Sequence, residues 1–488
     1  MKHRLTLAIA FAMAIQCIQG ATHTVKSAEE VEAVIESGNL AAGDTIVWTA
    51  GEYSDEELNI RGVHGTKEGP ITLRASKPGG VVLGGESKFN IGADWWEIEG
   101  FHFDGSDGKT NSYNSVQFRG SGGDAANHSK LKSCAMTNLN AEDESSKWVQ
   151  IYGRSNTIER CHFSGKKSKG ALITVELGYL GDAEKAGHRI ALNYFADFAP
   201  QEGTDNEVIR VGYSGDQNKP ATCVIERNYF YRCDGEVEII SNKSSYNTYR
   251  SNTFRRCNGS LVLRHGHHAR VEGNFFFGDG AEDVGGIRII DSHHIVVNNY
   301  MQDLSGKTWN AALSILGGKK PSGGSDNGYQ AVDGICVAHN SIINCQRSIF
   351  LNKAKGSRAP TGLIANNLIV SQSGPLVVDE LSADKLEWKG NLMHGAPVGG
   401  IKPAITTDPG MERWEGRLRP GSVGPVVDAA VKIELIVGDD ITGRERPEVG
   451  LDIGADEVHG PSGDAMLAPL EPADVGVKFL LIDRADGI

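Results

Sequence analysis

Two acidic and two basic residues are spaced along one β-rich stretch in a way that suggests chemistry. Glu236 and Glu238 flank Val237, and on a strand both carboxylates would point to the same side. Two carboxylates about 7 Å apart repel each other unless a cation lies between them. Lys243 follows five residues after Glu238, and Arg264 lies twenty-one residues beyond Lys243. The pattern predicts a bound cation beside a basic pair that faces an anionic substrate.

The distribution of charge supports an anionic partner. The 488 residues have a formal net charge of −13, which argues against nucleic acid. The stretch 239–271 nevertheless contains no Asp or Glu. Its basic residues and histidines are Lys243, Arg250, Arg255, Arg256, Arg264, His265, His267, His268 and Arg270. A basic strip of this kind is either a solvated face or a site for one polyanion, and the neighbouring carboxylates favour the site.

The first residues have the order of an export signal. Lys2 and Arg4 precede an apolar run over 5–15, and a polar stretch leads to Ala21. The run is too short to span a membrane. We therefore expect a signal peptide at 1–20 and a secreted or periplasmic protein with no membrane partner. Without Lys2 and Arg4 the net charge becomes −15 (−13 − 2).

Seven of the eight cysteines lie beyond this signal, and their spacing includes no CxxC motif. We expect most of them to be buried apolar residues, with one or two disulfides left open.

A short pattern recurs along the chain: an Asn or small residue, one variable residue and a large apolar residue. It starts at 101, 134, 161, 193, 228, 252, 274, 299, 340, 367 and 391, in steps of 22 to 41 residues. Short segments rich in Val, Ile and Phe lie between these positions. Repeats of this length are typical of solenoids, whose coils cannot bury an apolar face alone.

We predict an all-β fold, a single-stranded right-handed parallel β-helix over 21–405. The repeated Asn side chains would form a ladder, each amide bonding the next about 4.8 Å away. A β-propeller is the alternative, but its units would be longer and more regular, about 40–50 residues each. Ser27, Glu30 and Gly38 predict a short N-terminal helix that covers the first coil. Beyond 405 the repeat fades, so 406–488 is predicted to be a C-terminal tail or cap packed on the β-helix.

One-coil spacing would stack the candidate residues on neighbouring coils of one sheet. Asn206 lies thirty residues before Glu236, and Arg288 lies twenty-four residues after Arg264. The amide oxygen of Asn206 and the carboxylates of Glu236 and Glu238 form a hard oxygen set suited to calcium, with positions left for water and substrate.

Such a set could support β-elimination in a uronic acid polymer. The proton beside the sugar carboxylate must be removed, and calcium on that carboxylate would stabilise the enolate. Calcium and cationic neighbours favour the neutral amine of Lys243, which would then act as the base. Arg264 would stabilise or protonate the leaving glycosidic oxygen, although water could deliver that proton instead.

Four segments resemble polysaccharide lyase family 6, which contains alginate lyases and the dermatan sulfate lyase chondroitinase B. They are NEVIRVG at 206–212, DGEVEIISNKS at 234–244, LVLRHG at 261–266 and GGIRI at 285–289. The resemblance covers nearly the whole chain after the signal, including DIGADE at 452–457. It implies calcium at Asn206, Glu236 and Glu238, with Lys243 as base and Arg264 as acid. It also implies that Arg288 and His265 bind substrate.

Three classes of function would each require different residues. A lyase requires the Lys–Arg pair and a cation, a glycoside hydrolase requires two carboxylates across the glycosidic bond, and a polysaccharide-binding β-helix requires no base. We predict a lyase that cleaves alginate into oligosaccharides ending in an unsaturated uronate, with dermatan sulfate as the alternative substrate. Block preference and endo or exo action stay open. We expect a monomer, because the chain is too short for the second β-helix domain that some family members carry.

Overall fold

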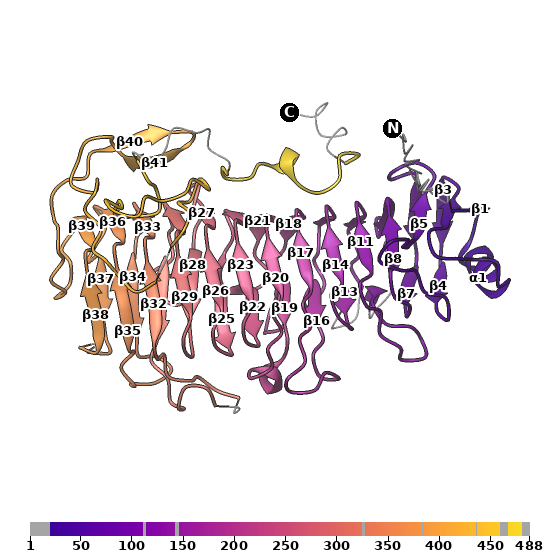
Figure 1. Cartoon of the computed structure of the whole chain (residues 1–488), viewed down its shortest axis with the longest axis horizontal. Coiled ribbons are helices and arrows are strands. Elements are labelled where there is room, and N and C mark those ends of the chain that lie inside the picture. The colour runs from indigo at the N-terminus through magenta and orange to yellow at the C-terminus, as the bar shows by residue number, and fades with distance from the viewer. Residues whose placement is uncertain are drawn as a thin grey trace, which may run out of the picture.

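The computed structural model describes residues 20–110, 114–141, 146–324, 327–382, 384–435, 437–458 and 467–480. Three long parallel sheets run side by side along the molecule (Figure 1). The chain visits the sheets in turn, and each coil contributes one strand to each. The predicted right-handed parallel β-helix is therefore confirmed, and the alternative of a β-propeller was wrong. The predicted signal peptide lies almost entirely outside the described residues.

Sheet A has 14 strands. They are β1 (Thr22–Val25), β2 (Thr45–Trp48), β5 (Ile71–Ala75), β8 (Trp96–Glu99), β11 (Lys130–Lys132), β14 (Thr157–Glu159), β17 (Arg189–Ala191), β20 (Val224–Glu226), β23 (Thr248–Arg250), β26 (Arg270–Glu272), β29 (Ile295–Val297), β32 (Ile335–Ala338), β35 (Gly362–Ala365) and β38 (Leu386–Lys389).

Sheet B has 13 strands. They are β3 (Gly51–Ser54), β6 (Val81–Gly84), β9 (Phe101–Asp104), β12 (Ala135–Thr137), β15 (His162–Ser164), β18 (Tyr194–Phe198), β21 (Tyr229–Cys233), β24 (Thr253–Arg255), β27 (Phe275–Phe277), β30 (Tyr300–Gln302), β33 (Ser341–Ile343), β36 (Leu368–Ser371) and β39 (Leu392–Gly395).

Sheet C has 12 strands. They are β4 (Glu57–Ile60), β7 (Lys88–Ile91), β10 (Asn114–Gln117), β13 (Lys147–Ile151), β16 (Ile173–Val175), β19 (Ile209–Val211), β22 (Glu238–Lys243), β25 (Gly259–His265), β28 (Val284–Ile289), β31 (Leu313–Leu316), β34 (Ile349–Asn352) and β37 (Val377–Asp379).

The recurring triplet explains how the coils stack. Its first residue forms the predicted ladder at the turn between sheets A and B, where each Asn Nδ2 donates to the next Asn Oδ1 at 2.9–3.0 Å. The ladder consists of Asn193, Asn228, Asn252, Asn274, Asn299, Asn340, Asn367 and Asn391. The third residue of the triplet points into the core. Five phenylalanines at this position stack with ring centroids 4.5–5.1 Å apart: Phe163, Phe195, Phe230, Phe254 and Phe276.

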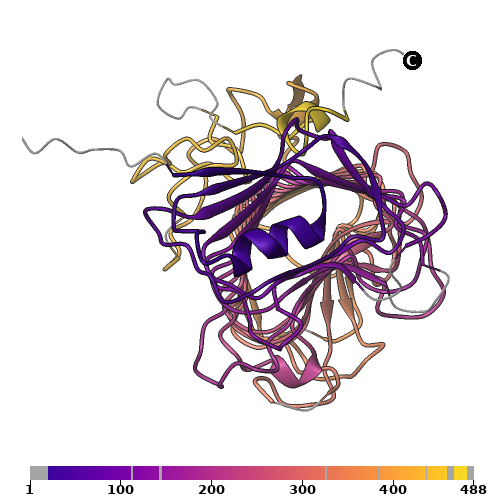
Figure 2. The ribbon, with the colours of Figure 1, turned by 90° about the vertical axis from the view of Figure 1, so that its right-hand side faces the viewer.

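A short helix covers the N-terminal end, as predicted. Helix α1 (Ala28–Glu36) begins where the Ser27 hydroxyl accepts the Glu30 N–H at 3.1 Å. Val31 and Ile35 on its inner face are buried. In the view along the β-helix axis, α1 lies across the opening of the first coil (Figure 2). It therefore shields the apolar edge that a solenoid would otherwise expose.

The C-terminal segment packs on the outside of the β-helix. It contains the antiparallel pair β40 (Met411–Trp414) and β41 (Arg417–Pro420), and the single turn η2 (Pro472–Asp474). Apolar residues of 426–455 cover the outer face of β27, β30, β33 and β36, and Leu470 and Val475 cover β18 and β21. Figure 1 shows this segment running back along the molecule from the C-terminal coils.

Two further predictions concern cysteines and membranes. The seven cysteines of the described residues are free, and six of them are buried. The apolar role is confirmed for these six, and no disulfide joins the cysteines of the described residues. Within the described ranges, no helix is long and apolar enough to cross a membrane.

Candidate active site

The candidate residues come together on the outer face of sheet C. Strands β19, β22, β25 and β28 are neighbours in this sheet. Along β22, Ile240 and Asn242 point into the coil, so by alternation Ser241 and Lys243 point outward, and Ser241 is buried there as well. Arg288 lies outward on β28, two strands away from Ser241 in the same register row. The one-coil spacing in the sequence thus does place these residues side by side.

Arg264 lies on the outer face beside a β-bulge in β25. Asn242 is opposite Leu263 and Lys243 is opposite His265, so Arg264 is the extra residue on β25. Val262 lies in the outward row with Ser241 and Arg288, and Leu263 points into the coil, so alternation already turns Arg264 outward; the bulge brings His265 opposite Lys243. Arg264 Nε lies 4.0 Å from Glu238 Oε1, which brings the predicted acid beside the predicted metal ligands.

The predicted strand around Glu236 was wrong in its extent. Strand β22 begins at Glu238, and Glu236 lies in the preceding turn. Glu236 Oε1 accepts the Asn206 N–H at 3.3 Å. Burial, followed by the charges of Glu207 and Glu238, raises the pKa of Glu236 to about 8. Glu236 and Glu238 therefore interact electrostatically, although they do not lie on the same strand.

The sequence analysis missed Glu207. Its Oε1 lies 3.3 Å from Lys243 Nζ, and its Oε2 lies 3.6 Å from Arg210 Nη1. The Glu207 side chain is 1% exposed, and burial raises its pKa against the opposing effect of the two cations. The predicted neighbours of Lys243 were calcium and cations, and the structure adds a buried carboxylate as its ion-pair partner. The available signal was a carboxylate directly after Asn206 and two residues before strand β19.

Two arginines are held by aromatic residues of loops that follow in the sequence. Arg264 Nη1 donates to the Gly328 carbonyl at 2.7 Å, and its guanidinium lies 4.1 Å from the Tyr329 ring centroid. Arg288 Nε donates to the Trp309 carbonyl at 2.9 Å, and its guanidinium lies 5.4 Å from that ring. Both ring contacts are in the range of cation–π interactions.

Both arginines also approach Glu238, since Arg288 Nη1 lies 3.8 Å and Arg264 Nε 4.0 Å from its Oε1. These contacts fix the two cations next to the carboxylates.

His265 is buried behind these groups. Its Nδ1 bonds with Gln330 Oε1 at 3.2 Å, and the side chain is 1% exposed. Burial and the charges of Arg264 and Lys243 lower the pKa of His265 to about 3, so its ring is neutral at physiological pH. Direct contact between His265 and substrate stays a prediction.

The oxygen donors fit calcium chemically. Glu236 and Glu238 supply carboxyl groups, and because burial and the neighbouring carboxylates raise the pKa of Glu236, a bound cation would favour its charged form. The Asn206 Oδ1 accepts the Gly170 N–H at 3.0 Å and retains a second lone pair. No three Asp, Glu, His or Cys side chains among the described residues already form a metal-binding group. Water and substrate would therefore have to complete the coordination.

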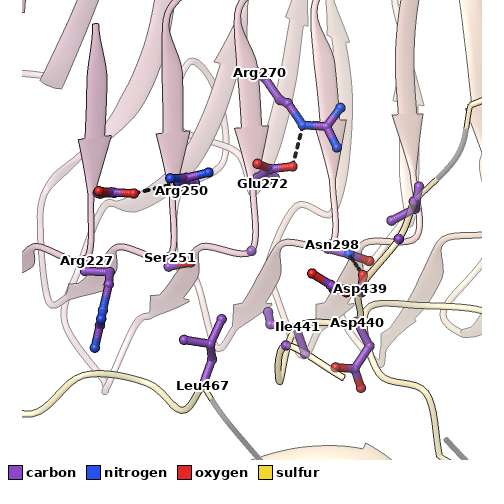
Figure 3. A pocket seen from close by; sticks show the side chains of 15 residues that line it. Arg227, Arg250, Ser251, Arg270, Glu272, Asn298, Asp439, Asp440, Ile441 and Leu467 are labelled. Atoms are coloured by element: carbon purple, nitrogen blue, oxygen red, sulfur yellow. Dashed lines mark hydrogen bonds and ion pairs between the residues drawn. The ribbon is translucent and has the colours of Figure 1, made fainter. Parts of the chain in front are cut away.

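A cavity of about 400 Å³ lies elsewhere, between sheet A and the C-terminal segment (Figure 3). Four of its charged groups are already paired. Arg250 Nε lies 2.7 Å from Glu226 Oε2, and Arg270 bonds with Glu272. We therefore place the candidate chemistry on sheet C.

The site thus places a lysine, two arginines and several carboxylates on one sheet of a parallel β-helix. The chain belongs to the chondroitinase B family, whose model matches residues 25–408. The solved structure of the PL6 family alginate lyase AlyGC is similar, with 29% identity and a TM-score of 0.78. The match covers 94% of this chain and 59% of AlyGC, so the chain spans well under two thirds of that protein.

Two further solved structures are similar. A mannuronic acid specific polysaccharide family 6 lyase from human gut microbiota is 28% identical with a TM-score of 0.70, covering 80% of this chain and 92% of that one. The PL6 family polysaccharide lyase Pedsa3628 from Pseudopedobacter saltans shares the fold at 24% identity, with a TM-score of 0.63 and coverage of 79% and 97%. No curated protein sequence matches the chain.

Proposed function

We propose that the protein is a secreted polysaccharide lyase that cleaves alginate by calcium-assisted β-elimination. The observation that carries the proposal is the placement of Lys243 and Arg264 on neighbouring strands, with Glu238 beside Arg264. Family membership and the similarity to solved alginate lyases support it. The export pattern at 1–20 supports secretion.

In the proposed reaction, the neutral amine of Lys243 accepts the proton from C5 of a uronate residue. The electron pair of that C–H bond forms the C4–C5 double bond, and the C4–O bond to the neighbouring sugar breaks. Its electron pair goes to the leaving oxygen, which takes a proton from Arg264 or from water held there. Glu207 lies 3.3 Å from Lys243 and stabilises the ammonium that forms.

Asn206, Glu236 and Glu238 would hold the calcium ion. When bound, calcium would supply a Lewis acid that neutralises the uronate carboxylate and lowers the cost of removing the C5 proton. Arg288 would bind a substrate carboxylate, because its Nη2 has no hydrogen-bond partner among the described residues. His265 would support substrate binding from behind these groups, as a neutral ring.

Alginate is favoured because the similar solved proteins at 28–29% identity are an alginate lyase and a mannuronic acid specific lyase. Dermatan sulfate is the second candidate, because the matching family model is that of chondroitinase B. Binding to either polyanion should weaken with added salt, since exposed charges are screened.

The test is incubation of the protein with alginate, its defined blocks and dermatan sulfate at matched salt, with Lys243→Ala as the control. A lyase produces an ultraviolet-absorbing unsaturated uronate, a glycoside hydrolase produces new reducing ends without that absorbance, and a binding protein produces neither. Faster cleavage of dermatan sulfate would overturn the substrate assignment. Absence of absorbing product from every polymer would refute the lyase.

A further inference from the structure

A second cavity lies on the same outer face of sheet C, toward the N-terminal end. It is formed by β4, β7 and β10, and its volume is about 320 Å³. Lys88, Asn90, Gln117 and Arg119 are among the residues that line it. The volume is at the lower end of the range of about 300–1,000 Å³ that is usual for ligand pockets.

A continuous row of polar side chains, buried from Gln150 to Ser241, leads along the sheet from this cavity to the candidate active site. The row is in register across seven neighbouring strands of sheet C. It consists of Asn59, Asn90, Gln117, Gln150, Thr174, Arg210 and Ser241. The Ser241 hydroxyl donates to Glu238 Oε2 at 2.6 Å, so the row ends at the candidate active site. Gln117 and Ser241 are four strands apart, about 19 Å at about 4.8 Å per strand.

The cavity offers the groups that a uronic acid polymer requires. The Arg119 guanidinium lies 4.1 Å from the Tyr152 ring centroid, and no carboxylate in the described part of the chain pairs with it. Lys88 Nζ lies 3.1 Å from Glu57 Oε1, whose side chain is 53% exposed. Gln117 Nε2 donates to Asn90 Oδ1 at 2.7 Å, and both amides retain further donors and acceptors for hydroxyl groups.

The carboxylates beside the row between the cavity and the site are partly offset by cations or hydrogen bonds, and the 65% exposed Asp205 pairs with Arg210 at 2.7 Å. Glu176 is a carboxylate beside the row, and its Oε1 accepts from Gln150, Thr174 and Tyr213 at 2.8–3.0 Å. Three donors disperse its negative charge. The cations of the cavity and those of the candidate active site can therefore act on one extended chain.

We propose that this cavity is a remote subsite that binds a uronate of the same polymer several sugar residues away from the reacting one. The inference rests on the proposed function, since it assigns the remainder of the polymer to this face. Arg119 and Lys88 bind the carboxylate, and Asn90 and Gln117 bind hydroxyls. The remote subsite makes the enzyme prefer long chains over short ones.

The experiment compares alginate tetramers and dodecamers as substrates of the wild type and of the double variant Lys88→Ala/Arg119→Ala. Each exposed charge contact contributes modestly, so the ratio of kcat/KM for dodecamer to tetramer should fall about three- to tenfold, through KM. Lys130→Ala is the matched control. Lys130 lies on sheet A and pairs with Glu97 at 2.6 Å, so its loss should leave the ratio unchanged.

A second measurement separates this inference from the proposed function. Titration of the inactive Lys243→Ala variant with the same oligomers measures binding without turnover. Tighter binding of the dodecamer that disappears in the triple variant with Lys88→Ala and Arg119→Ala supports the remote subsite, whether or not the wild type is a lyase. Equal affinity for both lengths, or an unchanged preference in the triple variant, would overturn it.

Discussion

Replacing Lys243 by Arg distinguishes a proton acceptor from a fixed charge. The guanidinium would keep a cation near Glu207, whose Oε1 lies 3.3 Å from Lys243 Nζ, but arginine does not give up its proton in proteins. A positioned general base contributes about 10²–10⁴ in rate, equivalent to about 3–5 kcal/mol of activation free energy. We expect kcat of Lys243→Arg to fall by at least this factor, with little change in polymer affinity.

The assay is the initial rate of unsaturated uronate formation from alginate, together with calorimetric titration of the polymer. Lys243→Ala should lose the same rate and also thermal stability, because Glu207 is 1% exposed and would keep only Arg210 as its cation. If Lys243→Arg turned over at nearly the wild-type rate, the positive charge alone would explain Lys243, and the base would have to be another group.

Three further outcomes are expected. Chelation of calcium or Glu236→Ala should abolish most activity and leave the circular dichroism spectrum intact, whereas full activity in chelator would remove the metal from the mechanism. Asn274→Ala should lower the free energy of unfolding by at least about 3 kcal/mol in urea titrations, because it leaves two donors of Asn252 and one carbonyl unpaired. The exposed control Asn39→Ala should leave the free energy of unfolding unchanged. Stability should also fall as the pH drops from about 6.5 toward 3, by up to about 1.4 kcal/mol per pH unit for each buried neutral histidine, because the unfolded chain binds protons there and the folded protein does not. Burial lowers the pKa of four histidines to about 3: His188, His265, His294 and His339. Urea midpoints that stay constant from pH 7.5 to 5 would contradict this last expectation.

The fold could be predicted because each coil repeats a short sequence pattern. Asn at the turn and Phe two positions later recur in phase, and each stacks on its own kind in the next coil. This periodic signal survives the insertion of loops, since the same triplet resumes after each one. The α1 cap was predictable for a local reason, because Ser27 and Glu30 are three residues apart.

The details of the site were harder to predict because they depend on contacts across coils and loops. The bulge beside Arg264, which brings His265 opposite Lys243, leaves no pattern in a single strand. Tyr329 and Trp309 lie 65 and 21 residues from the arginines they contact, on loops without a repeat. The ion pair between Glu207 and Lys243 joins neighbouring coils. The number of residues per coil varies along the chain, so this contact does not follow from a fixed repeat.

The C-terminal segment changes how the solenoid can come apart. In a stack whose coils contact only their neighbours, unfolding can begin at either end and spread one coil at a time. Here the segment leaves the last coils, and its Leu470 N–H bonds Thr253 on β24, its Gly476 N–H bonds the Leu192 carbonyl, and its Phe479 ring lies 6.2 Å from His102 on β9 (Figure 1). Peeling this segment away would therefore release contacts on coils far from the end. The segment couples distant coils into a more cooperative unit, with the candidate active site on sheet C within the tied region.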